Sequence, residues 1–463
     1  MKNKSIWESF LKHEFKSLNK DLDTDVLIIG GGIAGLLTAY SLKNSNLKVT
    51  IVERNKIFSG VTSKMTAKVT ILEDILTKIS EDKLDLYLKS QLEGLNILKN
   101  NINNLNIECD FKSNIGYLYT SKKSNIKKLK NIETHLKNLN IKFSNCELPI
   151  KELNSLYSIS IDNSYEINII KYLNNIIDNL NNTDIYEDTN IIEVKKENKY
   201  YVARTKNNII KAKIIVFASN YPYFIKPLLF PLKVRLEKSY IMYGKSNYNG
   251  NYNLINIDKK TTSIRFYKNK IIYLTNSKYI SHTKSIDYEK STNNNLINNI
   301  DNCWTNMDLI TNDYLPLVGK IYNNMYIITG FNTWGILSSH IGSSIIANTI
   351  LKHNRYLKYQ ELFNPRRNIN LKKIINSSVN IYENMNGFFK GIINKNNLVY
   401  YSKDKAIYID SKGNNHVVNR KCPHLKCKLI FNSHELTWDC PCHGSRFNLD
   451  GKVINGPSKY DIS

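Results

Sequence analysis

The chain has 463 residues, enough for two or three domains with a sizeable core, and this length excludes a peptide or a lone small module. Its 65 Lys and Arg outnumber its 40 Asp and Glu, which gives a formal net charge of +25. Such a balance is typical of proteins that bind nucleic acid. Only nine of the basic residues are Arg, however, the side chain that recognition of phosphate and bases favours. The composition therefore predicts solvated, lysine-rich faces and no nucleic-acid partner.

The N-terminal segment, residues 1–22, is predicted to form a short helix, because its large apolar residues recur at helical spacing. It has neither the apolar core nor the cleavage site of a secretory signal, and the chain contains no run of about 18 apolar residues. We therefore expect a cytoplasmic protein without a transmembrane segment. Docking of a lysine-rich face to a membrane surface is compatible with this expectation.

A strand, a helix and a second strand are predicted next. Residues 25–30 form an apolar run typical of a buried parallel strand, and a similar run ends at Glu53. Three glycines between them have the G-x-G-x-x-G spacing: Gly30, Gly32 and Gly35. In this spacing the glycines permit a tight turn, close approach of a pyrophosphate and close packing of helix on strand, while the acid after the second strand binds ribose hydroxyls. The pattern predicts a dinucleotide site.

The rest of the chain divides by its periodicity. Residues 70–185 are mostly helical in pattern, residues 232–282 alternate as in an antiparallel sheet, and residues 325–351 have the pattern of a strand, a turn and a helix. A polar stretch, residues 371–386, is predicted to be a linker, and residues 387–463 contain short strands and turns. The predicted fold class is α/β followed by a small all-β domain.

Several segments, GGGIAGLLTAY, GVTSKMTAKVT, IIVFASN and ITGFNTWGIL, resemble the D-amino-acid-oxidase-like family of FAD-dependent oxidoreductases, the glycine and sarcosine oxidase group. The resemblance covers residues 23–370. It implies a Rossmann-like domain that binds FAD, with an inserted antiparallel-sheet domain for the substrate. It implies that the flavin ring lies beside Gly330, Asn332, Trp334 and Gly335, and that the remaining FAD-binding residues are Gly30, Gly32, Gly35, Glu53, Arg54, Thr62 and Ser63.

Candidate substrate contacts lie in the inserted sheet. They are Arg235, Tyr240, Arg265, Tyr267 and Trp304. An Arg in such a pocket can clamp a substrate carboxylate through two hydrogen bonds, and the alternative for each Arg is an ion pair on a strand surface. No general base is predicted. Cys303 is expected to be a buried thiol, with covalent attachment of FAD as the alternative.

The C-terminal region concentrates four of the seven cysteines. Cys422 and His424 form C-x-H, and after 15 residues Cys440 and His443 form C-x-x-H. Two thiolates on one iron and two imidazoles on the other are the ligands of a Rieske 2Fe-2S centre. Zinc also accepts two Cys and two His, but its modules usually present C-x-x-C. These four residues are therefore predicted to ligate a 2Fe-2S cluster.

The two loops and the Gly444-Ser445 pair after them resemble the Rieske ferredoxin-like domain, over residues 387–463. In Rieske proteins of quinol-oxidising respiratory complexes, two further cysteines join the cluster loops. The resemblance implies a disulfide between Cys427 and Cys442, with free thiols as the alternative in a reducing cytosol. It also implies that Ser445 donates a hydrogen bond to a sulfide of the cluster.

Together the two modules predict a dehydrogenase. A small substrate, an amine or an amino acid, would reduce FAD, and electrons would pass through the cluster to an external acceptor. Two alternatives remain open: a reductase or oxygenase-like enzyme in which the cluster feeds electrons to FAD, and a non-catalytic redox sensor. The expected partners are therefore a small-molecule substrate and an external electron acceptor or donor.

Overall fold

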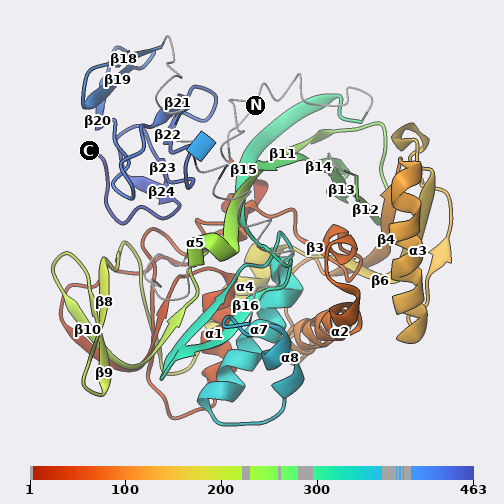
Figure 1. Ribbon diagram of the computed structural model, residues 1–463, viewed down its shortest axis with the longest axis horizontal. Helices are drawn as coiled ribbons and strands as arrows, with labels where there is room; N and C mark the ends of the chain where they lie inside the picture. The colour runs from red at the N-terminus through yellow and green to blue at the C-terminus, as the bar shows by residue number, and fades with distance from the viewer. Residues whose placement is uncertain are drawn as a thin grey trace.

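The computed structural model describes residues 4–221, 230–258, 262–279, 296–367 and 398–463, with Tyr382, Met385, Asn386 and Phe389 between the last two ranges. Figure 1 shows a sheet covered by helices, a second sheet beside it, and a small C-terminal domain coloured blue. The predicted linker, residues 371–386, lies almost entirely outside the described residues.

The first sheet has eight strands and the predicted βαβ unit at its centre. Its main strand order is β16-β17-β10-β1-β2-β7, and β1 pairs in parallel with both β2 and β10. A two-stranded extension, β8 and β9, joins at β10. The strands are β1 (Leu22–Ile29), β2 (Val49–Val52), β7 (Thr183–Tyr186), β8 (Glu193–Glu197), β9 (Tyr200–Arg204), β10 (Ile209–Phe217), β16 (Leu317–Tyr322) and β17 (Met325–Thr329).

Both faces of this sheet are covered, which explains its apolar central strand. Val26 and Ile28 pack into one core with the helices, whereas Leu27 and Ile29 face a second core that includes Leu309 of the other sheet. Alternate residues of a strand point to opposite faces, so a strand buried on both sides is apolar throughout. The helices are α1 (Ile33–Leu42), α2 (Glu81–Asn104), α3 (Lys123–Asn138), α4 (Ile169–Asp178), α5 (Phe230–Lys233), α7 (Gly335–Ile350) and α8 (Leu357–Leu362).

The N-terminal segment differs from its prediction. Within its described part, residues 4–22, the helix that forms is a short 3-10 helix, η1 (Ile6–Phe10), and residues 11–19 after it have no regular secondary structure. Trp7 is fully buried and its Nε1 donates to the carbonyl oxygen of Met65 at 2.7 Å, while the backbone N–H of Leu18 donates to Thr189 Oγ1 at 3.0 Å. The helix predicted over residues 1–22 was wrong because these tertiary contacts hold the chain extended along the body of the protein.

The second sheet has nine strands and is mainly antiparallel, as predicted. Its main order is β15-β11-β14-β13-β12-β4-β6-β3, with β5 paired to β6 and a parallel pair between β12 and β4. Its strands are β3 (Lys68–Val69), β4 (Lys112–Thr120), β5 (Ser144–Asn145), β6 (Tyr157–Glu166), β11 (Val234–Lys245), β12 (Tyr252–Asn256), β13 (Ser263–Tyr267), β14 (Lys270–Tyr279) and β15 (Asn299–Thr311).

The C-terminal domain contains two small sheets around its own core. One consists of β18 (Val399–Tyr401), β19 (Lys405–Ile409) and β20 (Asn415–Asn419). The other consists of β21 (Ile430–Asn432), β22 (Thr437–Asp439), β23 (Arg446–Phe447) and β24 (Val453–Asn455). Trp438 and Phe447 are fully buried in this core together with the cysteines of the predicted cluster. The domain therefore has the compact all-β form expected.

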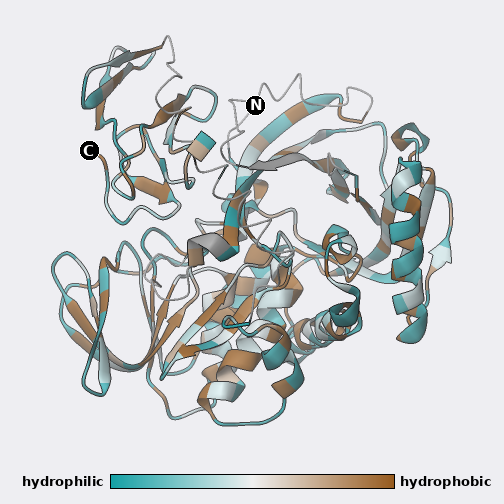
Figure 2. Ribbon diagram, viewed as in Figure 1, coloured by the Kyte–Doolittle hydropathy of each residue, from teal (hydrophilic) through white to brown (hydrophobic). Residues whose placement is uncertain are grey.

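Hydropathy follows these layers. In Figure 2 the central strands and the helices α1 and α7 are largely brown, whereas α3 is mainly teal. Among the described residues, no helix has both the length and the hydropathy that crossing a membrane requires.

Candidate functional site

A cavity of about 1100 Å³ lies between the two sheets. Its wall includes the turn after β1, the end of β2, the segment 218–221 after β10, and the start of α7, together with residues of β11 and β15. The carboxyl ends of parallel strands and a helix N-terminus form one side, which is where an α/β sheet binds its ligand. Its volume is slightly above the range of about 300–1000 Å³ that is usual for small-molecule sites.

The predicted glycine turn has the geometry that phosphate binding requires. Gly30 has φ +122°, and a Cβ at this position would lie 2.7 Å from the carbonyl oxygen of Ala218. A Cβ on Gly35 would lie 2.0 Å from the carbonyl oxygen of Gly30, so only glycine lets α1 pack this closely on the turn. Gly30 and Gly32 line the cavity, and α1 begins immediately after Gly32. The cavity therefore faces a helix N-terminus.

Glu53 and Arg54 lie in the cavity wall at the end of β2. The Glu53 carboxylate accepts the backbone N–H groups of Gly31 at 2.8 Å and Asn55 at 2.9 Å, which fixes its orientation. Arg54 lines the cavity, but its Nη1 also donates to the carbonyl oxygen of Ser458 at 3.0 Å. The guanidinium thus connects this wall to the C-terminal domain.

Thr62 and Ser63 follow in the short helix η2 (Thr62–Lys64). Thr62 lines the cavity, and its Oγ1 accepts the backbone N–H of Ile33 at 3.0 Å, so it caps the first turn of α1. Ser63 is 1% exposed, and its Oγ has no hydrogen-bond partner among the described residues. Of this predicted pair, only Thr62 belongs to the cavity wall.

The segment before α7 forms another part of the wall. Asn332, Trp334 and Gly335 line the cavity, and Gly330, with φ +70°, shapes the turn behind them. Asn332 Oδ1 accepts the backbone N–H of Thr311 at 2.8 Å, which ties this segment to β15. Trp334 Nε1 donates to Asp74 Oδ1 at 2.9 Å. The predicted flavin-ring residues are therefore held in place by contacts to β15 of the second sheet and to the 3-10 helix η3 (Asp74–Thr77).

The five predicted substrate contacts are separated by the structure. Arg235 lines the cavity, where it donates from Nε to Glu237 Oε1 at 2.8 Å and from Nη2 to Tyr314 Oη at 3.1 Å. The other four, Tyr240, Arg265, Tyr267 and Trp304, lie outside the cavity wall. Arg265 is fully buried and donates to backbone carbonyl oxygens, including that of Thr66 at 3.0 Å. Because it holds the backbone, it is a structural residue.

The alternation of side chains along β11 explains why the prediction of Tyr240 as a substrate contact was wrong. On β11 the odd-numbered residues from Arg235 to Ile241 line the cavity, whereas Tyr240 packs in the core on the opposite face. Side chains alternate along a strand, and an error of one residue reverses the face. For two of the others, hydrogen bonds take the polar groups elsewhere: Tyr267 Oη donates to Asp110 Oδ2 at 3.1 Å, and Trp304 Nε1 donates to the carbonyl oxygen of Lys64 at 2.9 Å.

Two carboxylates of the cavity were missed from the sequence. Glu237 and Asp308 stand opposite each other on β11 and β15, and both line the cavity. Asp308 is only 8% exposed, and burial, followed by the charge of Glu237, raises the pKa of its carboxyl to about 7. The alternation of polar residues on these strands was the available signal, but the sequence does not specify which face meets the cavity.

The predicted cluster ligands lie close together in the C-terminal domain. A hydrogen bond joins the thiols of Cys422 and Cys440 and contributes to a lowered pKa of Cys422, about 7. The rings of His424 and His443 are 4.9 Å apart between centroids. Their Nδ1 atoms are buried and have no hydrogen-bond partner among the described residues. Burial lowers the pKa of His443 to about 4, which favours the neutral, metal-binding imidazole.

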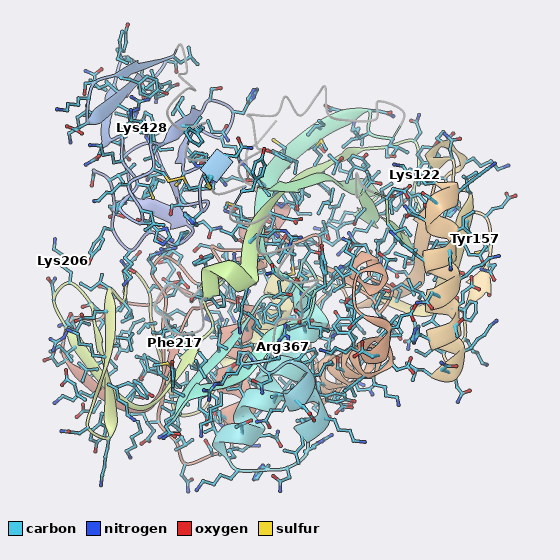
Figure 3. The ribbon with its side chains drawn as sticks, viewed as in Figure 1. Lys122, Tyr157, Lys206, Phe217, Arg367 and Lys428 are labelled. Carbon is cyan, nitrogen blue, oxygen red and sulfur yellow. A yellow bond between two sulfur atoms is a disulfide. The ribbon has the colours of Figure 1, made fainter. Side chains whose placement is uncertain are left out.

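These four residues fit an iron-sulfur cluster. Two buried Nδ1 atoms without partners are costly in a protein interior unless another group binds them. A disulfide joins Cys427 and Cys442, as the resemblance implied, and appears as a yellow bond in Figure 3. Ser445 is fully buried, its Oγ accepts the backbone N–H of Ser458 at 3.0 Å, and it hydrogen-bonds Cys422. The donor set and its support match a Rieske centre.

The C-terminal domain packs directly against the cavity. Ile454, Asn455 and Gly456 form part of the cavity wall. Asn190 Nδ2 donates to the carbonyl oxygen of Lys459 at 2.8 Å, on the same side as the contact from Arg54. One cavity thus has walls from both domains.

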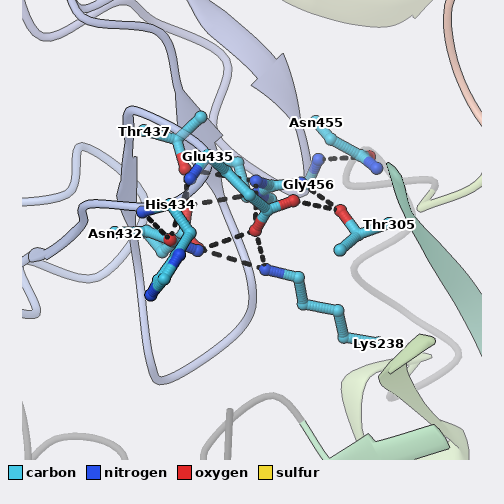
Figure 4. A network of polar contacts seen from close by, with 10 residues as sticks. Lys238, Thr305, Asn432, His434, Glu435, Thr437, Asn455 and Gly456 are labelled. Atoms are coloured by element: carbon cyan, nitrogen blue, oxygen red, sulfur yellow. Dashed lines mark hydrogen bonds and ion pairs between the residues drawn. The ribbon is translucent and has the colours of Figure 1, made fainter. Parts of the chain in front are cut away.

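A second contact between the domains is ionic, and Figure 4 shows it from close by. Lys238, on the face of β11 away from the cavity, is 2% exposed and pairs with Glu435 and Asp439. Arg446 pairs with the same two carboxylates, at 3.0 Å in each case, and its Nη1 donates to Thr305 Oγ1 of β15 at 3.1 Å. Two cations and two carboxylates therefore balance in this interface, which we call the ionic interface.

Comparison with known protein families divides the chain in the same way, into the two-sheet part and the C-terminal domain. The model of the FAD dependent oxidoreductase family matches residues 25–349, well over half of the chain, and that of the Rieske [2Fe-2S] domain matches residues 393–462. The chain belongs to the FAD dependent oxidoreductase family. It is an oxidoreductase with FAD and a Rieske-type 2Fe-2S cluster as cofactors.

The chain is also similar to a curated protein in sequence and to solved structures in fold. The chain is 27% identical to the "Putative Rieske 2Fe-2S iron-sulfur protein YhfW" of Bacillus subtilis (strain 168), over 96% of this chain and 94% of that protein. Glycine oxidase from Geobacillus kaustophilus is similar in fold, with a TM-score of 0.64 and 14% identity over 75% of this chain and all of that one. L-proline dehydrogenase from P. horikoshii has a TM-score of 0.63 and 17% identity, over 75% and 98% of the two chains.

Proposed function

We propose that this protein is a dehydrogenase that oxidises a small amine or amino acid and passes the electrons through its Rieske cluster to an external acceptor. The observation that carries the proposal is the shared cavity, whose wall includes both the predicted FAD-binding residues and Ile454, Asn455 and Gly456 of the C-terminal domain. Similar folds in glycine oxidase and L-proline dehydrogenase support a substrate with an amine nitrogen.

The residues proposed to hold FAD follow the cavity wall. The pyrophosphate would lie at the N-terminus of α1, beside Gly30, Gly32 and Thr62, with Gly35 and Ser63 behind them and Glu53 and Arg54 at the ribose. The ring would lie beside Asn332, Trp334 and Gly335, with Gly330 shaping their turn. A ring in this position would face the first turn of α7, where a helix N-terminus stabilises negative charge.

The residues proposed to hold the cluster are Cys422 and Cys440 on one iron and His424 and His443 on the other. Their buried, partnerless Nδ1 atoms and adjacent thiols support this set. Ser445 would donate its hydroxyl hydrogen to a sulfur of the cluster, because its oxygen already accepts from Ser458. The Cys427–Cys442 disulfide fastens the two ligand loops to each other.

When bound, FAD accepts two electrons at once and the cluster carries one at a time, so the pair converts a two-electron oxidation into single transfers. The chain itself contributes by holding its two domains in position. The ionic interface and the contacts of Arg54 and Asn190 hold the C-terminal domain against the FAD-binding part. Because the proposed electron acceptor is an external carrier and not oxygen, the cluster has a role in each turnover: it passes electrons from FAD to that carrier.

The test uses the purified holoprotein without oxygen and a panel of amines and amino acids. We expect one of them to bleach the flavin band, followed by the electron paramagnetic resonance signal of a reduced Rieske cluster. In Cys440→Ser protein the same compound should bleach the flavin without that signal. Bleaching in the wild type with an oxidised cluster throughout would disprove the electron path. No bleaching by any amine or amino acid would disprove the substrate class.

A further inference from the structure

The cavity is closed on one side by a single face of the nine-stranded sheet. On β11 this face presents Arg235, Glu237, Ser239 and Ile241 in order. On β15 the directly opposed residues include Asp308 and Asn306. Directly opposed residues of antiparallel strands have their side chains on the same face. The strand register therefore gives the order of chemical groups along the cavity wall.

One end of this face is ionic. Arg235 pairs with Glu237 at 2.8 Å, which balances one positive and one negative charge. Asp308 stands beside Glu237 as a second carboxylate and accepts from Asn306 Nδ2 at 3.2 and 3.3 Å. Within the part of the chain that the structure describes, Asp308 has no ion-pair partner. This end thus has, in Asp308, a second carboxylate beside the Arg235–Glu237 pair.

Two buried hydroxyl groups point to a ligand in the same space. Ser239 is 1% exposed and Ser263 is 6% exposed, and both line the cavity. Neither Oγ has a hydrogen-bond partner among the described residues. A buried hydroxyl without a partner is unfavourable, so both groups are poised to bind a molecule that fills the cavity.

The other end of the face is aliphatic. Ile241 on β11 is opposed by Leu274 on β14, Leu274 by Ser263 on β13, and Ser263 by Ile255 on β12. All four residues line the cavity. They form one row across four strands, and the three aliphatic side chains in it offer a nonpolar surface for the body of a ligand.

The ionic end adjoins the segment that we assign to the flavin ring. Asn332 accepts the backbone N–H of Thr311 at 2.8 Å and donates its own N–H to the carbonyl oxygen of Leu309 at 3.3 Å. Asn220 Nδ2 donates to the carbonyl oxygen of Met307 at 2.8 Å. These bonds lie on either side of Asp308 along β15. Asp308 and Glu237 therefore lie close to the part of the cavity that we assign to the flavin ring.

We propose that Asp308 and Glu237 bind the ammonium group of an amphipathic amine whose apolar body lies on Ile241, Leu274 and Ile255. This inference rests on the proposed function, because it names the substrate class of the same site. Ser239, between the two ends, and Ser263, within the aliphatic row, would each bind a polar group of the ligand. A neutral or acidic substrate of the same shape would leave the extra carboxylate without a cation.

Asp308 also accepts the proton that such a substrate must lose. An N–H bond of the ammonium breaks and an O–H bond forms on Asp308, which leaves a neutral amine and a neutral carboxylic acid. The raised pKa of Asp308, about 7, supports this transfer. The charged groups around it are Glu237 and Arg235 on β11, with Lys78, which pairs with Asp74 at 2.8 Å, on the facing wall.

The experiment measures binding to the purified holoprotein by isothermal titration calorimetry. The probe is tert-octylammonium, which has no hydrogen on the carbon next to nitrogen and so binds without being oxidised, and the comparison ligand is tert-octyl alcohol. We expect the wild type to prefer the ammonium by at least about tenfold, the effect of one hydrogen bond to a charged group. Asp308→Asn should abolish that preference, and Glu237→Gln should reduce it. Ile255→Val should weaken both ligands by about fourfold, the effect of one methylene.

The matched control is Asp301→Asn, because Asp301 lies on the same strand outside the cavity and pairs with Lys270 at 2.7 Å. This variant should keep the wild-type preference. Circular dichroism and flavin absorbance verify folding, and Glu237→Gln provides the test if Asp308→Asn does not fold. Equal binding of the two ligands by wild type, or an unchanged preference in Asp308→Asn, overturns the inference even if amines reduce the flavin. A preference for the ammonium without flavin reduction by any amine instead overturns the proposed function alone.

Discussion

The two cofactor regions of this protein are built in opposite ways. The proposed cluster site consists of two loops within residues 422–443, fastened by the Cys427–Cys442 disulfide inside one small core. The cavity proposed for FAD draws its wall from segments between Ile29 and Gly456, in both sheets and both domains. The first site is local and depends on few contacts. The second is shared, so that its shape depends on how the whole chain is packed.

The largest expected effect tests how local the cluster site is. Cys440→Ser removes one thiolate ligand, and we expect complete loss of the cluster's visible absorption with FAD still bound, because the cavity wall does not include Cys440. Cys146→Ser, at an exposed free cysteine, should retain both cofactors. Absorption spectra and iron content measure the outcome. A cluster retained in Cys440→Ser would refute the ligand set, and FAD lost with the cluster would show that the two sites are not independent.

The next effect tests the contact between the regions. Arg446→Met leaves the partly buried Glu435 and Asp439 with only Lys238 to balance them, and we expect this to lower the free energy of unfolding by about 3 kcal/mol. Arg355→Met, at an exposed arginine, should change it by less than about 1 kcal/mol. Chemical denaturation gives both values, and release of FAD, measured by its fluorescence, should be faster in Arg446→Met. Equal stability of the two variants would contradict a role of the ionic interface in holding the domains together.

An effect of similar size compares two carboxylates, Glu435 and Asp308, by pH. Burial alone would raise the pKa of Glu435, but the charges of Arg446 and Lys238 lower it from 4.5 to about 2. Its contribution to stability is therefore present above pH 4.5 and is lost as the pH falls toward 2. The pKa of Asp308 is raised from 3.8 to about 7, so its contribution is full below 3.8 and is lost as the pH rises through 7.

Each unit of pKa shift corresponds to about 1.4 kcal/mol of stability. In a plot of the free energy of unfolding against pH, the acidic limb (due to Glu435) and the limb that ends near neutrality (due to Asp308) are therefore both measurable by denaturation. Glu435→Gln should flatten the acidic limb only, and Asp308→Asn should flatten only the limb that ends near neutrality. If either variant changed the other limb, the assignment of opposite shifts to the two regions would fail.

The same contrast explains which features the sequence could predict. Gly30, Gly32 and Gly35, and likewise Cys422 and His424, act through spacing within one turn or loop, and a local pattern specifies local geometry. The sheet face of the cavity depends on strand phase. Arg235 and Tyr240 were equally good candidates by residue type, and only the fold decides that the first lines the cavity.

Contacts between distant segments left no signal in the sequence. Lys238 and Glu435 meet only because the C-terminal domain packs on one face of β11, and nothing near either residue indicates the other. Asp308 was missed for a related reason, since its environment is created by Glu237 across the sheet. The disulfide partners, by contrast, were implied by the resemblance to Rieske proteins of respiratory complexes, and the structure confirms them.

The position of Ile454, Asn455 and Gly456 in the cavity wall has a consequence for how the protein matures. Chains are synthesised from the N-terminus and their domains fold as units, so the C-terminal domain is the last part to fold. The cavity wall is therefore complete only after that domain has docked on the two sheets. Completion of the cavity is then a late step of assembly, and a truncated chain without residues 454–456 would have an incomplete wall.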